Sequence, residues 1–228
     1  MGINSRHDLP PAVLIFGGSF DPVHQGHVAL GAYFVKLLAP DELRIIPAGN
    51  PWQKQGLKAS GADRIEMVRR AFQGQAVPVL IDQQEIERAQ KSGQATYTID
   101  TLRSIRAEYG PETSIVCVLG SDQLLRLDTW RDWQQLFDYA HVCVASRPGF
   151  KLDMSAMPQV VSKEFARRAG TASQIRNSAH GLTYLAADLA IDISATEIRT
   201  ALQRGEQPEA LIPHVVLDYI QQQHLYKS

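Results

Sequence analysis

Short apolar runs alternate with helical patterns along most of this chain, and this alternation constrains its fold more than any other feature. The runs are Ala12–Phe16, Leu43–Pro47, Val79–Ile81, Ile115–Leu119 and Val142–Ala145. Continuous apolar character is typical of strands that are buried on both faces of a sheet. Between the runs, apolar residues recur at helical spacing, as in 30–38, 65–72 and 99–105. The sequence therefore predicts an α/β fold with a doubly wound, mostly parallel, Rossmann-like sheet.

The first apolar run leads directly into the segment Gly17–His27, which reads GGSFDPVHQGH. Two glycines at the end of a strand let the backbone approach a ligand closely. His24 and His27 stand three residues apart where a helix should begin, so both rings are expected on one face of its first turn. A helix N-terminus offers free N–H groups and partial positive charge. This segment is therefore predicted to hold a polyphosphate.

The order of strand, Gly-Gly, Asp-Pro and His-x-Gly-His resembles the signature of the nucleotidyltransferase superfamily that shares the HxGH motif. Neither a GxxxxGK[ST] loop nor a GxGxxG motif after the first run is present in the chain. The resemblance implies a nucleotidyltransferase fold, with the two histidines at the phosphates of a nucleoside triphosphate.

A second segment, Ile193–Arg199, supports the same family. As a local pattern it is a helix start, with Ser194 as N-cap, Glu197 completing a capping box and Ile193 and Ile198 in staple positions. It also resembles the ISxTxIR motif of these nucleotidyltransferases, in which the helix start and the arginine bind the β- and γ-phosphates. Capping explains Ser194 and Glu197 but not Arg199, whose guanidinium suits bidentate contact with phosphate.

Three further segments resemble those of the bacterial nicotinate-mononucleotide adenylyltransferases. They are Tyr97–Leu102, Gly120–Leu125 with the following Trp130 and Trp133, and Ser146–Gly149. The similarity extends from residue 12 to the C-terminus. It implies that ATP and nicotinate mononucleotide are the substrates, and that nicotinate adenine dinucleotide and pyrophosphate are the products. Mg²⁺ is expected to enter bound to ATP, because it prefers phosphate and water ligands, and no metal site of the chain's own is predicted.

The resemblance also implies which residues form the site. The catalytic group is expected to be His24, His27, Lys54 and Arg199. The ATP-binding residues are expected to be Gly17, Gly18, Ser19, Phe20, His24, Gly26, His27, Arg147, Ser194, Thr196 and Arg199. The mononucleotide-binding residues are expected to be Lys54, Tyr97, Thr98, Gly120, Asp122 and Trp130.

Several of these residues also have a purely structural interpretation. Trp130 and Trp133 have the spacing of one packed helical face, and the resemblance assigns pyridine stacking to Trp130 alone. Tyr97, Thr98 and Asp122 suit helix caps and turns equally well.

The sequence leaves two kinds of alternative function open. Other HxGH adenylyltransferases act on phosphopantetheine or on nicotinamide mononucleotide, although the phosphopantetheine enzymes are shorter and lack the segments around Tyr97 and Gly120. A catalytically silent nucleotide-binding regulator on the same fold is the second alternative. The intact histidine pair together with Arg199 argues against it.

Composition fits a cytoplasmic enzyme with one domain over residues 1–228. A formal net charge of −1 argues against binding nucleic acid or a membrane surface through a basic field. No apolar stretch is long enough for a transmembrane helix, and the first residues lack the core of a signal peptide. Cys117 and Cys143 lie in apolar runs and are expected to be reduced structural thiols. Residues 1–11 are expected to be a flexible extension and 151–181 a variable, lid-like insertion. The oligomeric state cannot be deduced from the sequence.

Overall fold

The computed structural model describes residues 10–51, 56–145, 157–186 and 193–227, in which six strands form one sheet. The strand order is β3-β2-β1-β4-β5-β6, and every neighbouring pair is parallel. The strands are β1 (Ala12–Gly18), β2 (Glu42–Pro47), β3 (Val79–Ile81), β4 (Ser114–Gly120), β5 (His141–Ala145) and β6 (Thr183–Ala186). The predicted doubly wound parallel sheet is confirmed.

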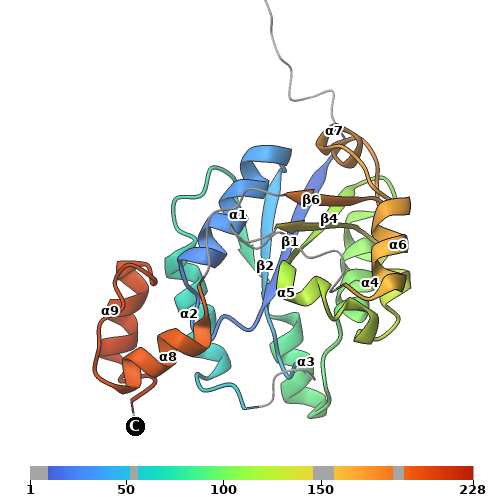
Figure 1. Ribbon diagram of the computed structural model, residues 1–228. Helices are drawn as coiled ribbons and strands as arrows, with labels where there is room; N and C mark the ends of the chain where they lie inside the picture. The colour runs from blue at the N-terminus through green and yellow to red at the C-terminus, as the bar shows by residue number, and fades with distance from the viewer. Residues whose placement is uncertain (1–9, 52–55, 146–156, 187–192, 228) are drawn as a thin grey trace, which may run out of the picture.

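Helices cover both faces of this sheet, as Figure 1 shows. They are α1 (Gln25–Leu38), α2 (Gly61–Ala71), α3 (Gln84–Ser92), α4 (Thr98–Tyr109), α5 (Ser121–Leu124), α6 (Gln159–Arg167), α7 (Ala172–Arg176), α8 (Ala195–Gln203) and α9 (His214–Gln222). Two short 3₁₀ helices, Leu127–Thr129 and Trp133–Asp138, follow α5. In the described ranges, no helix is long and apolar enough to cross a bilayer.

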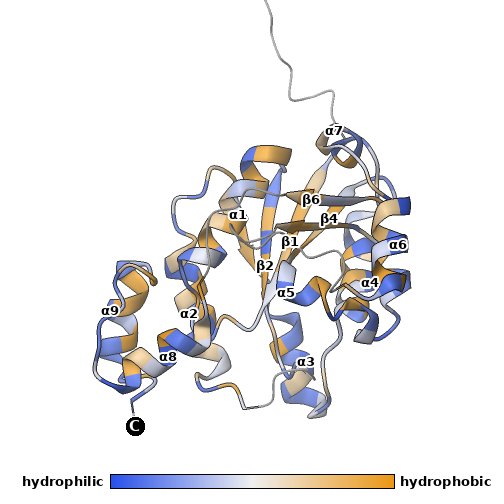
Figure 2. Ribbon diagram, viewed as in Figure 1, coloured by the Kyte–Doolittle hydropathy of each residue, from blue (hydrophilic) through white to orange (hydrophobic). Residues whose placement is uncertain are grey.

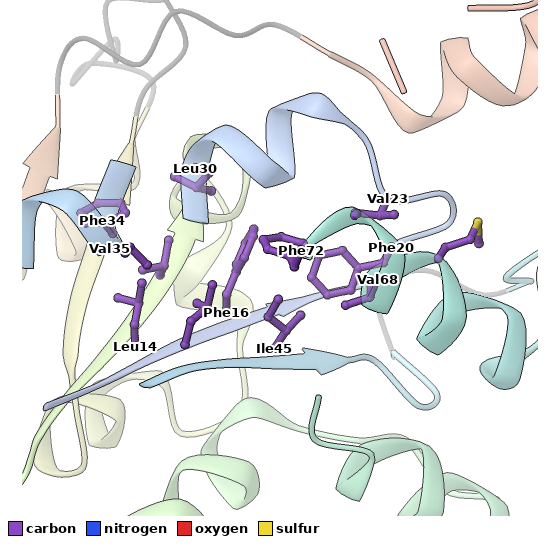
Figure 3. Close-up of a cluster of buried hydrophobic side chains, with 14 of the residues drawn as sticks. Leu14, Phe16, Phe20, Val23, Leu30, Phe34, Val35, Ile45, Val68 and Phe72 are labelled. Atoms are coloured by element: carbon purple, nitrogen blue, oxygen red, sulfur yellow. The ribbon is translucent and has the colours of Figure 1, made fainter. Parts of the chain in front are cut away.

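The alternation of side chains along β1 divides the core into two layers. Leu14 and Phe16 pack on one face with α1, α2, α8 and α9, whereas Val13 and Ile15 pack on the other face with α4 and α6. Figure 2 shows mainly apolar strands between helices that carry both hydrophilic and hydrophobic residues. Figure 3 shows the first layer, where Phe16 lies between Leu30 and Phe72.

The change in strand order places a crevice between β1 and β4. The chain moves outward from β1 to β2 and β3, then returns to β4 on the other side of β1 and moves outward to β5 and β6. In open parallel sheets, ligands bind at such a switch point, beyond the carboxyl ends of the strands. This end of β1 and β4 carries Gly18 and Gly120, which lie in the segments predicted to bind substrate.

The described part of the segment 151–181 is packed into the core. Phe165 on α6 and Ile175 on α7 are almost fully buried. The Ser114 hydroxyl of β4 donates to the Ile175 carbonyl at 2.8 Å, and the buried Arg176 guanidinium donates to the Pro10 carbonyl. These contacts therefore anchor residues 157–181 to the amino ends of β1 and β4.

Both cysteines are free and buried on neighbouring central strands. Burial raises the pKa of the Cys117 thiol to about 12, and it also raises the pKa of Cys143. Both side chains are therefore neutral thiols at physiological pH, as expected for structural cysteines.

Candidate active site

A cavity of about 640 Å³ opens at the carboxyl edge of the sheet, between the ends of β1 and β4. The starts of α1, α4, α5 and α8 all contribute to its wall. Four helix starts around one cavity concentrate backbone N–H groups there, so the site favours an anionic ligand.

The structure brings most of the predicted site residues to this cavity. Those lining it are Gly17, Gly18, Ser19, His24, Gly26, His27, Tyr97, Thr98, Gly120, Asp122, Trp130, Ser194, Thr196 and Arg199. Lys54 and Arg147 lie outside the described residues. Phe20 differs from the expectation, because its side chain is fully buried in the core and does not line the cavity. Its ring packs edge-on against the His27 ring, with the two centroids 4.9 Å apart, and this contact helps to fix the position of the histidine.

The two histidines lie on the first turn of α1, as their spacing predicts. His24 is the N-cap residue, and its backbone N–H donates to His27 Nδ1 at 3.2 Å. The two rings stack with their centroids 3.7 Å apart. At the end of β1, the Cβ of a side chain at Gly17 would meet no atom within 4 Å, so the backbone there borders open space. The loop and the histidine stack together leave room for a phosphate chain.

At the start of α8, the predicted capping box is wrong. Ser194 has the extended N-cap backbone conformation, but its side chain makes no capping hydrogen bond, and Glu197 is exposed. Only the staple part of the prediction is seen, since Ile198 is fully buried and Ile193 packs on the same cluster. The N–H groups of Ala195, Thr196 and Glu197 make no hydrogen bond within the described part of the chain. A helix start that is not capped by its own side chains is available to a phosphate.

The Arg199 guanidinium is fixed at two of its nitrogens. Nη1 donates to the Asp21 carbonyl oxygen at 2.7 Å, and Nη2 donates to Thr196 Oγ1 at 3.1 Å. These bonds connect α8 to the loop after β1 and hold the arginine at the cavity wall. The remaining N–H groups of the guanidinium, which has five donors, are left for a ligand.

The opposite end of the cavity is formed by the start of α4 and by Trp130. Tyr97 is the N-cap residue of α4, without a side-chain cap. The backbone N–H groups of Thr98 and Ile99 have no hydrogen-bond acceptor among the described residues. Trp130 is half-buried and lines the cavity, whereas Trp133 does not and instead packs edge-on against Phe137. Trp133 is partly buried against the core cluster, and the stacking role of Trp130 stays a prediction.

Sequence reasoning missed Arg131, a cation at this same end of the cavity. Its guanidinium carbon lies 4.9 Å from the centre of the Tyr97 ring, which is a cation–π arrangement. Its distances to the carboxylates of Asp100 and Asp132 are 3.8 and 3.9 Å, too long for hydrogen bonds. No motif marked this residue, although it directly follows Trp130.

Glu85 of α3 is a second residue of the wall that the sequence did not reveal. Its carboxylate accepts hydrogen bonds from Thr101 Oγ1 at 2.9 Å and from Thr96 Oγ1 at 3.1 Å. Burial raises the pKa of this carboxyl, and the two hydroxyls act in the opposite direction. The network ties α3 to α4 and holds the start of α4 in place.

Across 10–51, 56–145, 157–186 and 193–227, no three histidine, cysteine, aspartate or glutamate side chains cluster as metal ligands.

Comparisons with known proteins agree with this geometry. The cytidylyltransferase-like family matches residues 15–201. A probable nicotinate-nucleotide adenylyltransferase of Herminiimonas arsenicoxydans is 63% identical over 216 residues, which are 95% of this chain and 97% of the relative. A protein of the same name from Chromobacterium violaceum is 40% identical over 93% of this chain and 97% of its own length. This chain belongs to the nicotinate-nucleotide adenylyltransferase family.

Solved structures of similar fold support the architecture. The Plasmodium falciparum nicotinic acid mononucleotide adenylyltransferase complexed with NaAD aligns with a TM-score of 0.71 at 20% identity, over 95% of this chain and 97% of that one. At this identity, the likeness shows that the two chains share a fold.

Proposed function

We propose that this chain joins ATP and nicotinate mononucleotide to give nicotinate adenine dinucleotide and pyrophosphate in NAD biosynthesis. One observation carries the proposal: the starts of α1 and α8 and the aromatic side chains of Tyr97 and Trp130 line a single cavity. The phosphate end is formed by His24, His27 and Arg199, and the other end by Trp130 and Tyr97. The 63% identity with a probable nicotinate-nucleotide adenylyltransferase supports the proposal.

The reaction is an in-line displacement at the α-phosphorus of ATP. The attacking group is the 5′-phosphate oxygen of the mononucleotide, which is already ionised at neutral pH, so the enzyme needs no general base. Its residues position the two phosphates and stabilise the charge that builds up on the leaving pyrophosphate. In this proposal the starts of α1 and α8 hold the triphosphate, His24 and His27 contact the reacting phosphate, and Arg199 binds the β- and γ-phosphates. Lys54 is proposed to add charge and Arg147 to flank the adenine.

The pyridine end accounts for a preference for the acid over the amide. Trp130 is proposed to stack on the pyridine ring, and the free N–H groups of Thr98 and Ile99 to donate to the nicotinate carboxylate. Arg131 lies beside them on the Tyr97 ring and adds a positive charge. Donors bind an ionised carboxylate more strongly than a carboxamide, whose NH₂ group would face them as a second donor.

Mg²⁺ is proposed to arrive with the triphosphate, since phosphate oxygens and water are its preferred ligands. It would neutralise charge on the pyrophosphate as that group leaves. A cytoplasmic location is proposed as well, and the two free, buried thiols support it.

The decisive experiment measures pyrophosphate release from ATP in the presence of each possible acceptor. The purified chain is assayed with nicotinate mononucleotide, nicotinamide mononucleotide or phosphopantetheine. We expect turnover to be fastest with the acid. Faster turnover with either other acceptor would reassign the substrate, and ATP binding without turnover on any of them would indicate a nucleotide-binding regulator.

A further inference from the structure

Asp21, three residues before the histidine stack, joins several distant segments through its buried carboxylate. Oδ2 accepts the Lys58 backbone N–H at 2.8 Å, and Oδ1 accepts the Ala59 N–H at 3.0 Å. Oδ1 also accepts the hydroxyl of Tyr226 at 2.7 Å, across a separation of 205 residues. One side chain therefore connects the loop after β1, the loop before α2 and the C-terminal end of the chain.

The backbone of the same loop is held by two arginines. The Asp21 carbonyl oxygen accepts from Arg199 Nη1 at 2.7 Å, and the Ser19 carbonyl oxygen accepts from Arg64 Nη1 at 3.0 Å. Arg64 is 2% exposed and lies away from the cavity lining, so it acts on the loop and not on a ligand. Because Arg199 is hydrogen-bonded to the Asp21 backbone, any movement of Asp21 would displace this arginine at the cavity wall.

The position of Tyr226 beside Asp21 is fixed by the packing of the C-terminal region and by burial of its side chain. The preceding helix α9 packs on α2, where the Tyr219 hydroxyl donates to Asp63 at 2.9 Å and Arg70 lies over the Tyr219 ring. The Tyr226 side chain is buried, and burial together with the Asp21 hydrogen bond raises the pKa of its phenol well above the ordinary value. The hydroxyl therefore remains a donor throughout the pH range of a soluble enzyme.

We propose that Tyr226 is a positioning residue of the ATP site: its hydroxyl fixes Asp21, and through Asp21 it fixes Arg199 and the loop that leads to the histidine stack. The residue lines no part of the cavity and touches no substrate. The C-terminal end of the chain is thus part of the apparatus that orients the triphosphate. This inference rests on the proposed function, because it concerns the same ATP site.

The test compares Tyr226→Phe with Tyr219→Phe. Each substitution removes one phenolic hydroxyl from a tyrosine–aspartate hydrogen bond in the C-terminal region, but only Tyr226 is bonded to the loop of the site. We expect Tyr226→Phe to lower kcat/KM for ATP about tenfold or more, the scale of a lost hydrogen bond to a charged group. The KM for nicotinate mononucleotide should stay unchanged. Tyr219→Phe should leave both values at the wild-type level.

A double-substitution cycle with Asp21→Asn provides an independent measurement. If the hydroxyl acts through Asp21, the losses in kcat/KM for ATP from Tyr226→Phe and Asp21→Asn will not add in the double variant. Wild-type kinetics for a folded Tyr226→Phe protein, or equal kinetic losses in Tyr226→Phe and Tyr219→Phe, would overturn the inference. Titration calorimetry with ATP alone separates this result from failure of the proposed reaction, because weaker ATP binding by Tyr226→Phe requires no mononucleotide turnover.

Discussion

The imidazole rings of His24 and His27 stack with their planes 26° apart, at the entrance to the first turn of α1. His24 is 7% exposed, whereas His27 is half-buried and borders the cavity. Because the two rings are in contact and the His24 backbone N–H donates to the His27 ring, substitutions at the two positions should not have additive effects. The pair is best regarded as one unit of the proposed phosphate site.

Replacing His27 by alanine should leave the protein folded and lower kcat by roughly 10²–10⁴-fold, the range for losing a contact to a charged transition state. Steady-state assay of pyrophosphate release measures the loss. His214→Ala is the matched control, since this histidine lies exposed on α9 and pairs only with Asp218 in the described structure. A folded His27→Ala protein with near-normal kcat/KM would contradict the catalytic role.

Arg199→Lys retains the charge but removes the planar guanidinium, which donates to both the Asp21 carbonyl oxygen and Thr196 Oγ1. We expect the ATP-dependent rate to fall at least about tenfold, since lysine cannot hold the loop and a phosphate at once. Arg204→Lys, near the end of the same helix and exposed, should have no effect. If Arg199→Lys changes thermal stability without changing kinetics, the arginine is structural.

Ser194→Ala separates phosphate binding from helix capping. Because the Ser194 hydroxyl makes no capping bond, the free energy of unfolding should change little, while kcat/KM for ATP should fall. Thr171 is the contrasting case, since it forms a complete capping box with Gln174 at the start of α7. Thr171→Ala should destabilise the protein by about 1 kcal/mol without affecting kinetics. Urea unfolding and steady-state assay of both variants make the comparison.

His141 should make the protein less stable in mild acid. Its ring is buried, accepts the Leu182 N–H at Nδ1 and lies 2.8 Å from the Ser178 carbonyl at Nε2, and burial lowers its pKa to about 4. The unfolded chain binds a proton near pH 6.5, so stability is complete above that pH and is lost as the pH falls toward 4, by about 3 kcal/mol in total. Urea unfolding at pH 7.5 and pH 5 tests this, and His141→Gln should flatten the dependence. An equally steep dependence in that variant would assign the effect to other groups.

The strands and the start of α1 could be predicted from the sequence because local residue patterns determine them. Apolar runs located five of the six strands, and the spacing of His24 and His27 located a helix start, because both signals depend on a few neighbouring residues. The four-residue strand β6 (Thr183–Ala186) was missed, since a strand so short, with Leu185 partly exposed, lacks a distinctive apolar pattern.

Features of the site that depend on tertiary contacts could not be predicted from local sequence patterns. The capping box at Ser194 failed although its residues fit the local rule, because the side chains of a helix start at a ligand cavity need not bond to their own backbone. Asp21 and Tyr226 meet only through the docking of α9 on α2, and no local signal pairs residues so far apart. Arg131 likewise becomes part of the site only because the start of α4 lies beside it.

A prediction about the pyridine substrate tests the other end of the cavity. We expect kcat/KM for nicotinate mononucleotide to exceed that for the amide by at least ~10²-fold, because an amide leaves buried donors unpaired. Trp130→Ala should raise the KM for both mononucleotides and leave the KM for ATP nearly unchanged. An effect of Trp130→Ala confined to ATP would place the stacking residue at the wrong end of the cavity.

Arg131→Gln extends the same prediction to the charge beside Trp130. Removing the cation should weaken binding of the negatively charged nicotinate more than binding of the neutral amide, so the ratio of the two kcat/KM values should fall by about tenfold. Arg103→Gln is the matched control: Arg103 pairs with the same Asp100 and Asp132 carboxylates but does not line the cavity. Because both substitutions release the same carboxylates, a change in the ratio seen only in Arg131→Gln identifies a contact with substrate. Equal changes in the two variants would attribute the effect to the freed aspartates and leave the backbone N–H groups of α4 as the source of selectivity.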